Sequence, residues 1–151
     1  MQLFSPVFKQ GDMIPERHSR GGGNVSPALT WSGVPSEAKS LALLVDDPDA
    51  PTGRFVHWIV YHISPDTNRL REGIDYDAKL SSGLRQGAND FGDLGYGGPQ
   101  PPRGNHRYRF HLYALDCDVD LPPGAHRKDL DSAMRGHIVE EAELVGRYSA
   151  K

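Results

Sequence analysis

Two short segments of the chain, residues 40–45 and 55–63, are apolar at almost every position and end at turn-forming or polar residues. Segments of this length are typical of strands, and apolar side chains at successive positions predict strands that are buried on both faces. The chain also holds 17 glycines and 12 prolines, which argues against a helical bundle and favours short strands joined by many turns. We therefore expect a β-rich, single domain over residues 1–151.

The remaining elements are weaker but fit the same plan. Residues 106–115 alternate between an apolar face and a face of arginine, histidine and tyrosine, which predicts a strand with one core side and one wetter side. Short strands are expected at residues 28–31 and 144–148, and apolar spacing predicts a helical segment at residues 129–142, with Gly136 as a break or bend. The predicted fold is mainly antiparallel β with a helix placed late.

Composition excludes several classes of function. A formal net charge of −3 and a pI of about 6.1 give no reason to expect nucleic acid or an anionic membrane as a partner. Cys117 is the single cysteine, so an internal disulfide is excluded; between two aspartates we expect its thiol to be unreactive. The N-terminus has no secretory pattern and no segment matches a membrane span, so we expect a cytoplasmic protein without integral membrane association.

Three titratable residues, Asp47, His57 and His106, lie at or near strand ends. By strand parity each is expected to share a face with core residues: Asp47 with Leu41, Leu43 and Val45; His57 with Phe55 and Ile59; His106 with Tyr108 and Phe110. Buried polar groups need partners. If the three strands are neighbours, these side chains are expected to meet one another and a ligand. The simpler alternative for each histidine is a core residue whose hydrogen bonds are satisfied within the protein.

Two loops are expected to wall this site. Residues 47–51 contain two prolines that stiffen the backbone, and residues 95–104 are rich in glycine and proline directly before His106. Glycine permits close approach of backbone N–H groups to a ligand, and we expect N–H groups near Gly98 to form a small nest for oxygen atoms. An ordinary connecting loop would have a similar composition.

The same residues resemble a known family. The strings DDPDAP at residues 46–51 and VHWIV at residues 56–60, followed by GPQPPRGNHRY at residues 98–108, look like the two signature regions of the phosphatidylethanolamine-binding protein family, also called Raf kinase inhibitor-like proteins. The strings NVSP at residues 24–27 and GANDFG at residues 87–92 are similar to its bacterial and archaeal branch. The resemblance covers nearly the whole chain.

This resemblance implies a β-sandwich-like fold with a large central antiparallel sheet and an anion pocket. Carried over by position, the ligand-binding residues would be Asp47, Pro51, His57, Gly98, Pro99, His106 and Tyr108. Asp49 matches a second acidic residue of the motif, which we expect to orient the loop. Relatives bind phosphate, small anions or phospholipid head groups, and some modulate protein kinases or inhibit serine proteases. The resemblance implies no metal and no cofactor.

Two departures from the family pattern affect the site. Gln100 stands where relatives often have cysteine, so a thiol-dependent role at that position is excluded. The chain ends at Lys151, shortly after the last predicted strand, where eukaryotic members continue into a helix that partly covers the pocket. We therefore expect the mouth of the pocket to be more open, or to be gated by a second copy of the chain in a homodimer.

The expected function is binding of a small anion or phosphate group, with regulation of a phosphorylated or acidic partner, and without catalysis. His57 and His106 are expected to donate to the anion, so affinity should fall as pH rises through the range in which histidines titrate. Phospholipid head-group binding is the main alternative. Less favoured are an iron enzyme that uses Asp47, His57 and His106 as a facial triad, and a serine hydrolase, for which the chain offers no Gly-x-Ser-x-Gly motif.

Overall fold

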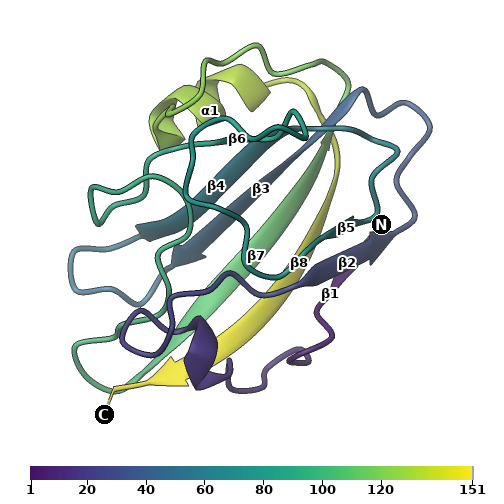
Figure 1. The fold of residues 1–151 in the computed structure, drawn as a ribbon. Coiled ribbons are helices and arrows are strands. Elements are labelled where there is room, and N and C mark those ends of the chain that lie inside the picture. Colours follow the sequence, from purple (N-terminus) through teal and green to yellow (C-terminus); the bar gives the residue numbers. More distant parts are fainter. Residues whose placement is uncertain (151) are drawn as a thin grey trace.

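The computed structural model describes residues 1–150 and consists of two antiparallel sheets (Figure 1). The strands are β1 (Gln2–Phe4), β2 (Leu29–Ser32), β3 (Ser40–Asp47), β4 (Phe55–Ile63), β5 (Arg69–Leu70), β6 (Arg85–Gln86), β7 (Asn105–Leu115) and β8 (Ile138–Ser149). A 3-10 helix covers Glu16–His18, and the α-helix α1 covers Arg127–Met134. The central sheet has the order β6-β4-β3-β7-β8 and the small sheet has the order β1-β2-β5. This architecture confirms the predicted mainly β, sandwich-like fold.

The central sheet is covered on both faces, which explains why β3 and β4 are apolar at successive positions. On one face, Leu43 of β3 packs in a core that includes Trp31 of the small sheet. On the opposite face, Leu44 packs in a second core that includes Leu130 and Met134 of α1. All eight residues of β3 are buried. The strand is thus fixed between two apolar layers, and its last residues are held as firmly as its middle.

The helix prediction is correct at its start and wrong at its end. α1 ends at Met134, Gly136 has a positive φ of 81°, and the predicted helical residues from Ile138 onward belong to β8. Strand β8 is therefore much longer than the predicted strand at 144–148. Its backbone pairs with β7 from Asn105 to Leu115, and this ladder overrides the weak helical spacing of the segment. Among residues 1–150, no helix is long and apolar enough to cross a membrane.

A bulge in β4 corrects the predicted face of Ile59, whereas His57 keeps the face it shares with Phe55. Val45 of β3 pairs with Trp58, whereas the next residue, Asp46, pairs with Val56, so His57 is an extra residue between the two pairs. Such a bulge switches the side-chain alternation of the strand. Ile59 consequently packs in the α1-side core, and it does not share the face of His57 as predicted.

Gly146 of β8 offers a test of this packing. A Cβ added at Gly146 would lie 2.6 Å from Ile14 and 2.8 Å from Phe8, two buried side chains of the N-terminal segment. Gly146→Ala should therefore lower the free energy of unfolding by roughly 1–3 kcal/mol, the usual cost of overpacking. The control is Gly21→Ala, because nothing lies within 4 Å of a Cβ there. Urea denaturation measures both; equal stability of the two variants would contradict the packing of β8.

Candidate functional site

Asp47 and His106 form a buried pair at the edge of the central sheet. β3 and β7 pair in antiparallel register with Asp46 opposite Arg109, so the next step of the ladder brings Asp47 to the start of β7. The Oδ2 atom of Asp47 lies 2.6 Å from Nδ1 of His106, and the two residues are only 3% and 7% exposed. Because a carboxylate only accepts, Nδ1 carries the proton, and Nε2 is the ring nitrogen that remains for a ligand. The sequence-predicted contact between these two residues is present.

The other carboxylate oxygen of Asp47 holds the following loop. Its Oδ1 atom accepts a hydrogen bond from the backbone N–H of Asp49 at 2.7 Å. Both oxygens of Asp47 are therefore engaged by donors of the protein, which reduces the repulsion that an incoming anion would meet. Breaking a buried pair of this kind by removing one partner typically costs about 3–5 kcal/mol, so the pair also fixes the geometry of the site.

Tyr108 has a buried hydroxyl close to Asp47 that makes no hydrogen bond of ordinary geometry. The side chain is 1% exposed, and among the described residues its hydroxyl has no hydrogen-bond partner. Burial, together with the nearby charge of Asp47, raises the pKa of Tyr108, so the group is a neutral O–H donor. A buried hydroxyl without a partner typically costs about 1–3 kcal/mol. Such a group calls for an explanation, and a ligand oxygen supplies one.

His57 lies on the same side but does not bond to Asp47 or His106. Its Nδ1 donates to the carbonyl of Gly97 at 2.6 Å, and its ring meets Tyr108 edge-on at 5.1 Å between centroids. Burial lowers the pKa of His57, and the Gly97 carbonyl offsets this only in part. The ring is neutral at pH 7, and its Nε2 accepts instead of donating. The expectation that His57 donates to the anion is therefore not supported, because its N–H is used on Gly97.

The expected backbone nest near Gly98 is already occupied by the protein itself. The N–H of Gly98 donates to Oδ1 of Asn24 at 2.7 Å, and the N–H of Gly97 donates to the carbonyl of His57 at 2.8 Å. Gly98 and Pro99 are both buried. A Cβ at Gly98 would lie 2.2 Å from the carbonyl oxygen of His18, so glycine is needed here for close packing. The two residues shape the wall, and their amides do not form the predicted anion nest.

Charged anchors hold the loop between β3 and β4. Asp49 accepts from the backbone of Arg107 at 2.9 Å and from its guanidinium at 2.8 and 3.0 Å, which lowers the pKa of Asp49 to about 2. Behind the sheet, Asp46 binds Arg54 and Arg109. Pro51 is exposed in this loop. Three ion pairs therefore hold the loop: those of Asp49 and Asp46 with Arg107 and Arg109 tie its start to β7, and that of Asp46 with Arg54 joins its two ends.

Sequence reasoning missed Asp46, although the motif itself contains the signal. Adjacent residues of a strand point to opposite faces, so a pair of aspartates at the end of β3 must supply one carboxylate to each side. Asp46 is fully buried on the α1 side, where the bonds from His111, Arg109 and Arg54 outweigh its desolvation and lower its pKa. The role of Asn24 was also missed, since nothing in its local sequence indicates a contact with Gly98.

The site does not coincide with either of two large cavities of the molecule. Cavities of about 790 and 670 Å³ lie elsewhere, one beside Ser40 and His62 and the other beside Leu3 and Leu144. The ligand atoms of Asp47, His57 and His106 are not among the groups of the described residues that converge within 4.8 Å, so the geometry gives no support to the iron-triad alternative. What marks the site is the buried pair next to an unpartnered hydroxyl.

The lowered pKa of His57 predicts a pH effect on stability. The unfolded state binds a proton near pH 6.5, whereas folded His57 does so only at lower pH, so its contribution is present above pH 6.5 and is lost as pH falls through the folded pKa. Between about pH 7.5 and about pH 5, wild type should therefore lose more stability than His57→Gln, whose amide can still donate to Gly97. Urea unfolding at each pH measures this; parallel curves would contradict the buried neutral ring.

Comparison with known proteins places the chain in a family. The family model described as phosphatidylethanolamine-binding protein matches residues 4–149. A UPF0098 protein of Methanothermobacter thermautotrophicus is 50% identical over 148 residues, which cover 98% of each chain. The crystal structure of the homologue CT736 of Chlamydia trachomatis has a TM-score of 0.90 and is 42% identical, with 99% of this chain and 97% of that chain covered. The crystal structure of E. coli YbcL also has a TM-score of 0.90 and is 34% identical, with 99% of this chain and 98% of that chain covered. The chain therefore belongs to the phosphatidylethanolamine-binding protein family.

Proposed function

We propose that this protein binds a phosphate-type anion at Asp47, His106 and Tyr108, and that it regulates phosphorylated or acidic partners by this recognition. The observation that carries the proposal is the Tyr108 hydroxyl, which is buried beside the Asp47–His106 pair without a hydrogen-bond partner among the described residues. A ligand oxygen would satisfy this donor, and Nε2 of His106 is the second group that can face the same ligand.

The charge of Asp47 is compatible with an anion because of how the carboxylate is used. It accepts from His106 and from the backbone of Asp49. When the imidazole of His106 is protonated, the pair is neutral overall and presents an N–H to the ligand.

Binding without catalysis is the proposal that the site supports best. No described group stands beside the pair as an activated nucleophile, and the Tyr108 hydroxyl remains protonated because burial raises its pKa. The partner classes stay those that the family resemblance implies, a protein kinase or a serine protease, and a phospholipid head group is the alternative ligand. A cytoplasmic location and a homodimer that gates the mouth belong to the same proposal.

Tyr108→Phe separates binding from folding. Loss of a hydrogen bond to a charged ligand should weaken phosphate binding by about ten- to a hundredfold. The same change should leave the urea midpoint unchanged or raise it, because the hydroxyl has no partner to lose. Tyr113→Phe, on the opposite face of β7, is the control and should bind phosphate as wild type does. Calorimetry measures the affinities; unchanged affinity in Tyr108→Phe would refute the assignment.

The pH dependence of binding tests the role of His106. Affinity should fall as pH rises, because Nε2 donates only while the imidazolium persists, and His106→Gln should lack this dependence. Sulfate is the better probe, since phosphate itself gains and loses a proton near neutral pH. Equal slopes in wild type and His106→Gln would remove His106 from the site.

The choice of ligand distinguishes the two sources of a phosphate group. Equal affinity for inorganic phosphate and phosphoethanolamine supports a small-anion site. Binding only to vesicles that contain phosphatidylethanolamine would instead support the head-group alternative. Both outcomes use the same residues, so the Tyr108→Phe variant serves as the matched control for each ligand.

A further inference from the structure

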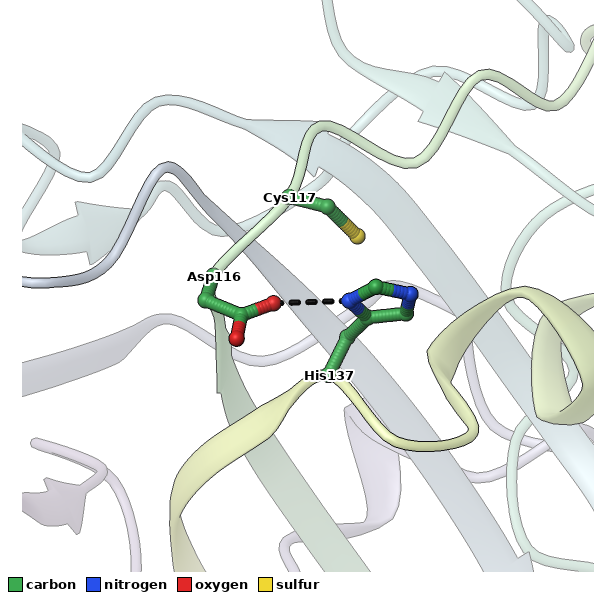
Figure 2. Close-up of side chains that lie close together, drawn as sticks. All are labelled: Asp116, Cys117 and His137. Atoms are coloured by element: carbon green, nitrogen blue, oxygen red, sulfur yellow. Dashed lines mark hydrogen bonds and ion pairs between the residues drawn. The ribbon is translucent and has the colours of Figure 1, made fainter.

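A second cluster of chemically active side chains lies at the other end of the central sheet. Asp116 and Cys117 directly follow β7, and His137 directly precedes β8, so the ladder between these strands brings the three residues together (Figure 2). β3 runs from Ser40 near this cluster to Asp47 at the anion site. Eight strand residues span roughly 25 Å, so the two places are chemically independent.

The donor atoms of the cluster converge on one point. The Oδ1 atom of Asp116 and Nδ1 of His137 are 2.7 Å apart, and the Cys117 sulfur lies with them in a group whose ligand atoms are all within 4.8 Å of one another. Figure 2 shows the thiol of Cys117, the residue after Asp116, turned toward the imidazole ring of His137. The arrangement joins two chain segments that are 21 residues apart in sequence, so it does not arise from local spacing alone.

The backbone around the cluster is held by hydrogen bonds on three sides. Asp116 N donates to the carbonyl of His137 at 2.9 Å, and His137 N donates to Met134 at 2.9 Å. The buried Ser40 hydroxyl donates to the carbonyl of Cys117 at 2.6 Å. These bonds fix the backbone from which each side chain extends. Only rotation of the side chains is then needed for their donor atoms to bind one ion.

One thiolate, one imidazole and one carboxylate form a donor set that suits zinc. Calcium and magnesium prefer oxygen donors alone, whereas sulfur and nitrogen select a softer ion. Tetrahedral zinc holds its ligand atoms roughly 3.3–3.6 Å apart, given bond lengths of about 2.0–2.3 Å. The distances within the cluster, all under 4.8 Å, are close to that geometry, and the 2.7 Å hydrogen bond between Asp116 and His137 would open to make room for the ion. Asp116 and His137 are exposed, so water can reach a fourth position.

A neighbouring cluster is less suitable. His111, Glu141 and Glu143 also converge within 4.8 Å. However, Nδ1 of His111 lies 3.0 Å from Glu141 and Nε2 lies 3.4 Å from Asp46, so both ring nitrogens face carboxylates. Burial lowers the pKa of His111, but the bonds from Asp46 and Glu141 outweigh it and raise the pKa, which favours the charged ring. This ring serves better as an ion-pair partner than as a metal ligand.

We propose that Asp116, Cys117 and His137 form a Zn²⁺ site, with water in the fourth position. The ion would tie the end of β7 to the start of β8 and close the segment that contains α1. Metal binding to the folded state adds to stability according to the ligand concentration. The site also assigns a use to the single thiol of the chain, which the anion site does not employ.

Cobalt substitution gives a direct test, because Cys117 is the sole cysteine. One equivalent of Co²⁺ should produce a sulfur-to-cobalt charge-transfer band in the near ultraviolet and tetrahedral d–d bands in the visible, and one equivalent of Zn²⁺ should abolish them. Cys117→Ser should lose the charge-transfer band. His137→Gln and Asp116→Asn should bind at least about tenfold more weakly, as even the loss of an outer-shell partner costs about 10–100-fold.

Two controls keep the result interpretable. His111→Gln, in the neighbouring cluster, should keep the cobalt spectrum of wild type. Zn²⁺ should raise the thermal midpoint of wild type but not of Cys117→Ser, and circular dichroism without metal should show that each variant is folded. Absence of the band in wild type would overturn the proposal. A band that His137→Gln leaves at full strength and affinity would also overturn it, since the thiol would then bind without the site.

Discussion

The antiparallel pairing of β3 with β7 is the constraint on which the geometry of the candidate site depends. The ladder sets Asp46 opposite Arg109 and delivers Asp47 to His106. One strand end thus supplies two carboxylates with different tasks. Asp46 ties the back of the sheet to arginines, and Asp47 holds a histidine and the following loop on the front. A one-residue slip would exchange these faces and leave each charge buried without its partner.

The site is rigid because most of its polar groups are committed before any ligand arrives. His57 is held by Gly97, Gly98 is held by Asn24, and Asp49 is held by Arg107. Against this background, the unpartnered Tyr108 hydroxyl is distinct. A rigid site with one unsatisfied donor loses little conformational entropy on binding, which suits recognition of a small anion.

Much of the fold was readable from the sequence because burial on both faces leaves a clear pattern. The runs that became β3 and β4 were identified almost to the residue. β8 was not, because its first half owes its strand conformation to pairing with β7, and its own residues favour helix and strand about equally. The face of Ile59 was misassigned for a related reason, since a bulge has no local signature in an apolar strand.

The candidate site, like the fold, could be predicted from the sequence only in part. Parity was sufficient to bring Asp47 and His106 together, because both lie in regular strand positions. It could not reveal that the Gly98 amide is taken by Asn24, which lies 74 residues earlier in the chain. Glycine-rich loops read as open to a ligand, yet a Cβ at Gly98 would meet the backbone of His18. Here close packing, and not ligand contact, explains the glycine.

Nitrogen-15 NMR of the histidine side chains tests the central claim most directly. Long-range proton–nitrogen spectra resolve Nδ1 and Nε2 of each ring, with and without phosphate. The Nε2 resonance of His106 should shift with saturating behaviour on addition of phosphate, while those of His62 and His126, away from the site, stay unchanged. A His106 resonance that does not respond, or histidines that all respond alike, would contradict an anion site at the Asp47–His106 pair.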